Sequence, residues 1–309
     1  MKLLSQSEKK VLSLLEQDCR LPAKQIAKKA RLSPEGVLKI IRRLEDAGVI
    51  TRFNTKYNYS RMGQKIYPVA IKLSKLNKEV IGIIKQMMLR HKTCVWFTFC
   101  EGEYDLLLSF RISSENDKQD MDSLLLEMSD YVAEKDVSIA LLAFEISKSF
   151  DGEGHSRRLF PVFDFNLEAV RLSLEERKIL DLLKENSRET VLNIAGKVGI
   201  GARAVSSKIK KLEKDGIISG FKTKVNTAAL GFQPCIALIS FNSHTTQDMR
   251  RFVTYCQHKQ GINYLLKQIG KYDVELTIDL PDVDGFYSLM EELREQFRFI
   301  KKVTTLISK

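Results

Sequence analysis

The sequence of 309 residues predicts an α+β fold that contains two copies of one composite unit. A shift of 168 residues aligns residues 4–63 with residues 172–231 without a gap, and 22 of these 60 pairs are identical. The same shift aligns residues 102–105 (Gly-Glu-Tyr-Asp) with residues 270–273 (Gly-Lys-Tyr-Asp). In each copy, apolar residues first recur at helical spacing and later alternate as they do in strands. These observations indicate a duplicated two-part unit, helical first and then sheet-forming.

The helical part of the first unit predicts three helices followed by a β-wing. Pro22 suits the first turn of the second helix, and Ser33 can cap the third. Gly48 ends the third helix, because glycine readily adopts the positive φ of a helix terminus, and residues 49–57 are expected to form the wing. The apolar face of the third helix consists of Val37, Ile41 and Leu44. This order of elements predicts a winged helix-turn-helix.

The matching stretch of the second unit, residues 203–220, predicts the same helix with a more basic face. Its apolar positions are Val205, Ile209 and Leu212, at the i, i+4 and i+7 spacing of one helix face. The opposite face carries cations and hydroxyls, namely Arg203, Ser206, Ser207, Lys210 and Lys211. Gly216 ends the helix, and the basic run to Lys224, which includes Lys222, is expected to form a wing.

The remainder of each unit predicts a ferredoxin-like sheet of βαββαβ order. In the first unit, strands are expected over residues 66–73, 94–99, 106–112 and 137–146, and helices over residues 78–90 and 117–132. The second copy is expected to have its helices around residues 248–257 and 283–297. The expected domains are winged helix-turn-helix domains at residues 1–63 and 172–231, ferredoxin-like domains at residues 64–148 and 232–309, and a linker at residues 149–171, whose apolar half is expected to pack.

The net charge of +11 is concentrated in the two helical parts. Residues 1–60 carry a net charge of +7, residues 172–231 carry +5, and the rest of the chain sums to −1. A uniformly basic surface would not show this partition. Two basic modules on a nearly neutral scaffold indicate a polyanionic partner that is contacted at two places.

Several functional classes lack support in the sequence. The five cysteines form no Cys-x-x-Cys pair, so a metal site or a disulfide scaffold is not expected. No glycine-rich phosphate loop or nucleophile elbow is present, and no cofactor is expected. The longest apolar runs, such as residues 139–144, are too short to span a bilayer, and the first residues lack an apolar signal core. We therefore expect a cytoplasmic protein.

The two composite units resemble the Lrp/AsnC (leucine-responsive regulator) family of prokaryotic transcription factors. The pattern Val-x-x-x-Ile-x-x-Leu-Glu-x-x-Gly-x-Ile occurs at residues 37–50 and 205–218, and each copy is followed at a constant distance by Gly-x-Tyr-Asp. In that family two chains pair their ferredoxin-like sheets, and small molecules such as amino acids bind near the sheets. The resemblance therefore implies an intramolecular pseudo-dimer that presents two DNA-reading heads.

The two heads are not equivalent. In the second head, the candidate DNA-binding residues are Arg203, Ser206, Ser207, Lys210, Lys211 and Lys222. In the first head they are Lys39, Arg42, Arg43 and Arg52. Glu35 stands where Arg203 stands, and Leu38 where Ser206 stands. We interpret the first head as the weaker or differently specific reader, which predicts a non-palindromic operator. For the helix of the second head, the alternative is a merely solvated basic face.

The Gly-x-Tyr-Asp turns are the candidate site for a small-molecule effector such as an amino acid. The residues concerned are Gly102, Tyr104, Asp105, Gly270, Tyr272 and Asp273. The alternative is a tight glycine turn between two strands, in which the aspartate bonds to backbone groups. The sequence leaves both interpretations open.

Two other functions remain as alternatives. Siroheme decarboxylases resemble the same two-domain fold, but they would require histidines or arginines arranged in a tetrapyrrole pocket. The four histidines of this chain are scattered, and none aligns with another at the repeat shift; they are His91, His155, His244 and His258. A module that binds protein partners through degenerate heads is the third interpretation, and Glu35 and Leu38 make it plausible for the first head.

Overall fold

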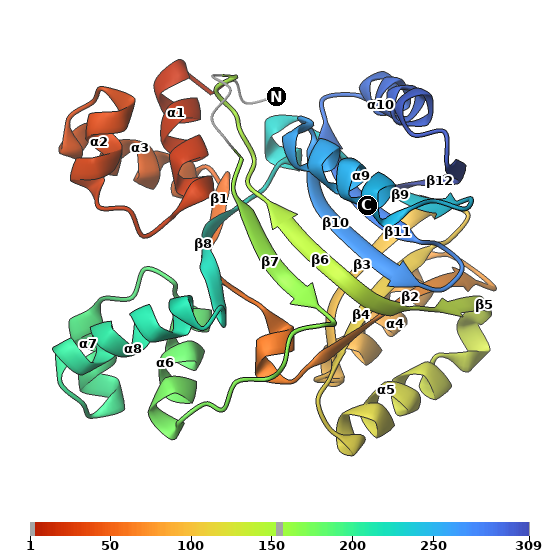
Figure 1. Cartoon of the computed structure of the whole chain (residues 1–309), viewed down its shortest axis with the longest axis horizontal. Helices are drawn as coiled ribbons and strands as arrows, with labels where there is room; N and C mark the ends of the chain where they lie inside the picture. The colour runs from red at the N-terminus through yellow and green to blue at the C-terminus, as the bar shows by residue number, and fades with distance from the viewer. Residues whose placement is uncertain (1–3, 153–156, 309) are drawn as a thin grey trace.

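The computed structural model describes residues 4–152 and 157–308, and it consists of two helical heads and two sheet domains. Figure 1 shows the heads side by side on one flank, with strands β1 and β8 between them, and the sheets with their covering helices on the other flank. In the described chain, no helix is long and apolar enough to cross a membrane.

Each head contains three helices at the predicted places. The first head has α1 (Gln6–Gln17), α2 (Ala23–Ala30) and α3 (Pro34–Asp46), and the second has α6 (Leu174–Glu185), α7 (Val191–Val198) and α8 (Ala202–Lys214). The Ser33 hydroxyl caps α3 by accepting a hydrogen bond of 3.0 Å from the Gly36 N–H. Gly48 and Gly216 follow α3 and α8 at φ of +67° and +71°, which a glycine adopts without strain.

A separate wing does not form within each head, and this part of the prediction was wrong. Each head supplies one strand, β1 (Ile50–Tyr57) or β8 (Ile218–Val225), and the two pair with each other in antiparallel register with Phe53 opposite Thr223. Because each head has a single strand, the hydrogen bonds of its ladder are satisfied by the other head. The heads therefore share one hydrophobic core, which joins α1 and α3 to α6 and α8.

Both sheet domains have the ferredoxin-like strand order. The first contains β2 (Lys65–Leu73), α4 (Lys78–Arg90), β3 (Cys94–Gly102), β4 (Leu106–Ile112), α5 (Glu115–Glu127) and β5 (Val132–Val137), in the order β5-β2-β4-β3. The second contains β9 (Gln233–Phe241), α9 (Thr246–His258), β10 (Ile262–Ile269), β11 (Val274–Leu280), α10 (Val283–Gln296) and β12 (Ile300–Ser308), in the order β12-β9-β11-β10. Short 3-10 turns at Tyr59–Met62, Ser129–Tyr131 and Ala228–Leu230 complete the elements.

The single strand predicted at residues 137–146 is replaced by two strands that serve different sheets. β5 pairs with β2 of its own domain, whereas β6 (Ile139–Ile146) pairs with β10 of the second domain. Residues 159–164 of the predicted linker form β7 (Leu159–Asp164), which pairs with the outer edge of β6. The chain thus crosses from one sheet to the other at Ser138.

The two sheets form one continuous ten-stranded assembly. On one side β3 pairs with β12, with Glu101 opposite Ile307, and on the other side β10 pairs with β6, with Ile269 opposite Ile139. These two pairs are related by the repeat, so the domains are arranged as an approximate two-fold pair. Helices α4 and α5 share an apolar core with the first sheet, and α9 and α10 with the second. The predicted intramolecular pseudo-dimer is confirmed.

Candidate nucleic-acid interface

Helix α8 presents the polar face that its sequence predicts. Val205, Ile209 and Leu212 are buried in the shared core of the heads. Four predicted DNA-binding side chains on the other face are exposed, namely Arg203, Ser207, Lys210 and Lys211, and Ser206 is half-buried beside them. A helix fixed by one face and exposed along the other has the form of a recognition helix.

Some cations of α8 are already paired within the head. Lys211 Nζ lies 2.8 Å from Glu176 Oε1 of α6, and this hydrogen bond raises the pKa of the lysine. Lys208 Nζ lies 2.9 Å from Glu175 Oε2. In contrast, Arg203 and Lys210 form no ion pair with any described residue. The cations of α8 without an ion pair to a described residue are therefore Arg203, Lys210 and Lys214.

Helix α3 offers a different surface in the first head. Lys39 and Arg42 are exposed, and Arg43 Nε lies 3.2 Å from Glu8 Oε1 of α1. Glu35 is exposed in the first turn, and the Leu38 side chain is 44% exposed on the same face. The first head thus lacks an arginine at the position of Arg203 and a serine at that of Ser206.

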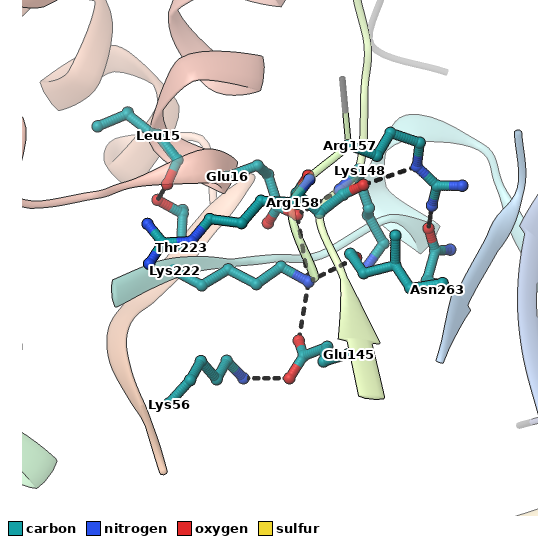
Figure 2. Close-up of polar contacts among 12 residues, drawn as sticks. Leu15, Glu16, Lys56, Glu145, Lys148, Arg157, Arg158, Lys222, Thr223 and Asn263 are labelled. Carbon is teal, nitrogen blue, oxygen red and sulfur yellow. Dashed lines mark hydrogen bonds and ion pairs between the residues drawn. The ribbon is translucent and has the colours of Figure 1, made fainter. Parts of the chain in front are cut away.

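Lys222 is buried, and this contradicts its predicted place on the DNA-binding surface. The residue is 2% exposed, and its Nζ lies 2.8 Å from Glu145 Oε1 and 3.3 Å from Glu16 Oε2. Figure 2 shows Lys222 reaching Glu145 of β6, which also pairs with Lys56 at 2.6 Å. Because β8 lies between α1 of the first head and strands β6 and β7, Lys222 points inward. It joins both heads to the sheet domains.

The charges of this buried cluster stabilise one another. Burial opposes the charged form of Lys222, but the carboxylates of Glu145 and Glu16 outweigh it and raise the pKa of the lysine. Burial likewise favours the neutral form of Glu145, yet Lys222 and Lys56 hold the pKa of this carboxyl well below its usual range. The cluster is therefore an ionised network at neutral pH.

Arg52 lies between the heads and not on a wing tip. Its Nη2 donates hydrogen bonds of 3.1 Å and 3.3 Å to the carbonyl oxygens of Lys184 and Glu185 at the end of α6. The guanidinium thus provides hydrogen-bond donors to carbonyl groups at a helix C-terminus, where positive charge is favoured. Its side chain is still half-exposed, so a DNA contact by Arg52 stays a prediction.

The structure brings the two Gly-x-Tyr-Asp turns together between the sheets. Tyr104 and Tyr272 are 1% and 3% exposed, and their ring centroids lie 6.2 Å apart in an edge-to-face arrangement. The Tyr104 hydroxyl donates to Asp136 and accepts a hydrogen bond of 2.6 Å from Lys271 Nζ. The Tyr272 hydroxyl donates to Glu103 Oε1 at 2.8 Å. The two tyrosines therefore form part of the contact between the sheets.

The two aspartates and glycines of these turns bond to or approach the backbone. Asp105 Oδ2 accepts the Leu73 N–H at 2.9 Å, and Asp273 Oδ2 accepts the Phe241 N–H at 2.7 Å. A Cβ on Gly102 would lie 2.7 Å from the Thr305 carbonyl oxygen, and one on Gly270 would lie 2.2 Å from Ser138 Oγ. These four residues hold the turns in place; an effector role for them stays a prediction.

Glu103 and Lys271, next to the tyrosines, were not among the predicted site residues. Lys271 Nζ lies 3.3 Å from Glu103 Oε1 and 3.2 Å from Asp136 Oδ2. Lys302, together with Tyr272 and Lys271, lowers the pKa of Glu103 to about 2. The sequence did contain a signal for this pair: the two residues align in the repeat but have opposite charges. Repeat mates that meet near an approximate two-fold axis can form an ion pair only if their charges differ.

The described histidines do not gather into one site. His91 Nδ1 lies 3.0 Å from Asp120 Oδ1 on α5, whereas His244 stacks against Phe299 in the second domain. His258 ends α9, and His155 lies outside the described residues. Among the described residues, no group of three or more His, Cys, Asp or Glu side chains could hold a metal ion.

Comparison with known proteins assigns both heads to one class. A family model described as winged helix-turn-helix DNA-binding matches residues 4–51 and again residues 176–219. An HTH-type transcriptional regulator of Pyrococcus furiosus is 36% identical over 112 residues, which cover 36% of this chain and 73% of that protein. A regulator of Pyrococcus abyssi is 29% identical over 116 residues, which cover 37% of this chain and 75% of that protein.

A solved structure matches the full tandem arrangement. The crystal structure of the siroheme decarboxylase NirDL aligns with 98% of this chain and 91% of its own, with a TM-score of 0.65 and 12% sequence identity. At this identity the likeness shows a common fold and nothing about activity.

The fold, the exposed recognition helices and the family model define a tandem helix-turn-helix protein of the DNA-binding class. Since one relative is 36% identical over 73% of its length, the chain belongs to the family of HTH-type transcriptional regulators. The predicted duplication of a winged helix-turn-helix of the transcriptional-regulator class is confirmed.

Proposed function

We propose that this chain regulates transcription by binding DNA through both heads, with α8 as the principal reader of sequence. The observation that carries the proposal is the exposed face of α8, where Arg203 and Lys210 remain unpaired above a buried apolar face. An arginine near the start of a recognition helix can contact a guanine edge, whereas Lys210 suits a phosphate. The hydroxyls of Ser206 and Ser207 add hydrogen-bonding groups beside them.

One chain supplies both heads, and their relative position is fixed by the β1–β8 ladder and by their common core. The spacing between α3 and α8 therefore selects the separation of two half-sites without assembly of a second chain. Because α3 and α8 carry different residues, the two half-sites should differ in sequence. We propose that the protein acts in this way in the cytoplasm.

A small metabolite, such as an amino acid, is the proposed effector, and the contact around Tyr104 and Tyr272 is its proposed place of action. These side chains join the two sheets, so a ligand that changes their hydrogen bonds would change how the sheets pack. Lys222 of the second head pairs with Glu145 of strand β6 and with Glu16 of the first head, so this buried cluster connects the ten-stranded sheet to both heads. This gives a physical route from sheet packing to head position.

The proposal is tested by selecting bound duplexes from a random pool with the full chain, followed by electrophoretic shifts at two salt concentrations. Arg203→Ala with Lys210→Ala should reduce affinity for the selected duplex at least tenfold. Lys301→Ala serves as the matched control, because this exposed lysine belongs to β12, a strand on the flank opposite the heads (Figure 1). Failure to enrich any sequence, together with unchanged binding by the double variant, would refute the proposal.

The tetrapyrrole enzyme alternative has a separate test. The chain shares the whole-length fold of the siroheme decarboxylase NirDL, at 12% identity. Adding haem or siroheme to the protein and recording the visible spectrum would reveal a bound tetrapyrrole by a shifted Soret band. We expect no shift, since the described histidines lie apart and His91 is occupied by Asp120 and Glu127.

A further inference from the structure

We infer that the two heads divide the DNA contact, so that α2 of the first head clamps phosphates while α8 of the second head reads bases. The inference rests on the proposed function and adds a set of residues to it. These residues are Lys24, Lys28, Lys29 and Arg31, which are all exposed on α2 and on the turn that leads to α3.

The first observation is the arrangement of these cations. Lys24 and Lys28 lie at i and i+4 on one face of α2, away from the buried residues Ile26, Ala27 and Ala30, and Arg31 follows at the end of the helix. None of the four cations forms an ion pair with a described residue, and α2 contains no acidic side chain. An unneutralised group of cations of this kind attracts a polyanion.

The second observation concerns the repeat mates of these cations. In the second head, the positions of Lys24, Lys28 and Arg31 are held by Leu192, Gly196 and Gly199. Leu192 is 74% exposed, and Lys197 of α7 is already paired with Glu189 at 3.7 Å. The unpaired cations of α2 thus have no counterpart on α7 of the second head.

The third observation is the backbone conformation of Arg31. It ends α2 at φ +58°, and it is the one residue other than glycine with positive φ in the described part of the chain. A side chain in this left-handed region costs free energy, whereas Gly199 takes the equivalent position without that cost. An arginine kept at a strained position indicates a role for its charge.

Phosphate is the partner that this geometry favours over base edges. Only one helix of a helix-turn-helix enters the major groove, and in the first head that helix is α3, while α2 crosses the backbone. On α3, Glu35 and Leu38 replace the arginine and serine of α8. Point charges on α2 therefore add affinity without sequence information.

The experiment measures dissociation constants of the full-length protein for the selected duplex and a scrambled duplex, each over a range of salt concentrations. Lys28→Ala with Lys29→Ala should weaken binding to both duplexes by the same factor and reduce the salt slope by about two, roughly 0.9 for each lost phosphate contact. Arg203→Ala with Ser206→Ala should instead weaken binding to the selected duplex more than to the scrambled one. Lys197→Ala, the repeat mate of Lys29, is the matched control and should change neither quantity.

Arg31→Gly provides an independent measurement on the same cations. It should raise the melting temperature, because the left-handed strain is removed, and it should also lower the salt slope by about one. A variant that simply damaged the fold would lower the melting temperature instead.

The outcomes separate this inference from the function on which it rests. If the wild-type protein binds no duplex, the proposed function fails and the inference falls with it. If the wild-type protein discriminates between the duplexes, two results overturn the inference alone: an unchanged slope in the Lys28/Lys29 and Arg31 variants, or a loss of discrimination in the Lys28/Lys29 variant equal to that of the Arg203/Ser206 variant.

Discussion

Glu103 and Lys271 occupy the same position of the two repeats, yet they have opposite charges and lie in contact. Two identical chains paired in this way would bring two glutamates or two lysines together near the two-fold axis. Joining both halves in one chain permits each position to differ from its mate. The duplication has therefore produced a pair of complementary halves, and the positions where repeat mates differ most show how the halves are held together.

Lys222 and its repeat mate Asn54 give the largest expected difference between the halves. Lys222→Met should lower the free energy of unfolding by roughly 3–5 kcal/mol, because Glu16 and Glu145 would remain beside an uncharged side chain in the interior. Asn54→Ala should cost under about 1 kcal/mol as an ordinary half-buried substitution. Denaturant unfolding of the two variants makes the comparison, and similar losses in both would mean that the cluster does not hold the heads to the sheets.

Glu275 differs from its repeat mate Leu107 in carrying a carboxyl between the sheets. The residue is 7% exposed and its cross-strand neighbours are Leu266 and Leu238, and burial raises its pKa to about 7. A carboxyl whose pKa is raised on folding stabilises the native state below its unfolded pKa, near 4.5, and this stability is lost as the pH rises through about 7. The loss is on the order of 3 kcal/mol.

Glu275→Leu makes the two halves alike and should remove this loss. The urea midpoint of the variant, relative to that of the wild type, should be higher at pH 8 than at pH 5. Glu295→Gln, which changes an exposed carboxylate of α10, should leave the pH dependence as it is in the wild type. A variant that follows the same pH dependence as the wild type would show that Glu275 ionises freely in the folded protein.

Lys271→Glu tests the complementary contact itself. It would place a third carboxylate beside Glu103 and Asp136, and we expect a loss of about 1 kcal/mol because these side chains are partly exposed and screened. Lys301→Glu makes the same charge change on an exposed part of β12 and should have little effect. The stability of both variants is measured from their unfolding midpoints at low and at high salt. The loss in Lys271→Glu should shrink as salt is added. A loss independent of salt would indicate a packing effect.

Local signals were enough to predict the helices of the heads and the first three strands of the first sheet, but not its last strand. The spacing of Val205, Ile209 and Leu212 and the stop at Gly216 define α8 with no reference to the rest of the chain. Local signals could not predict the partner of strand β1, because β1 could pair with a strand of its own head or with a strand of the other head. Lys222 could not be recognised as buried, because its carboxylate partners Glu16 and Glu145 are far away in the sequence.

The caps of the two recognition helices provide the smallest expected difference. Ser33 caps α3 through its hydroxyl, whereas its repeat mate Gly201 begins α8 with no side-chain cap. Gly201 has φ −63° and ψ 147°, which a serine adopts readily, and a Cβ there would meet no atom within 4 Å. Gly201→Ser should therefore stabilise the protein by a few tenths of a kcal/mol, about 0.3, and Ser33→Gly should cost a similar amount. Replicate denaturation curves of both variants can resolve opposite signs, and a destabilised Gly201→Ser would show that the start of α8 needs the freedom of glycine.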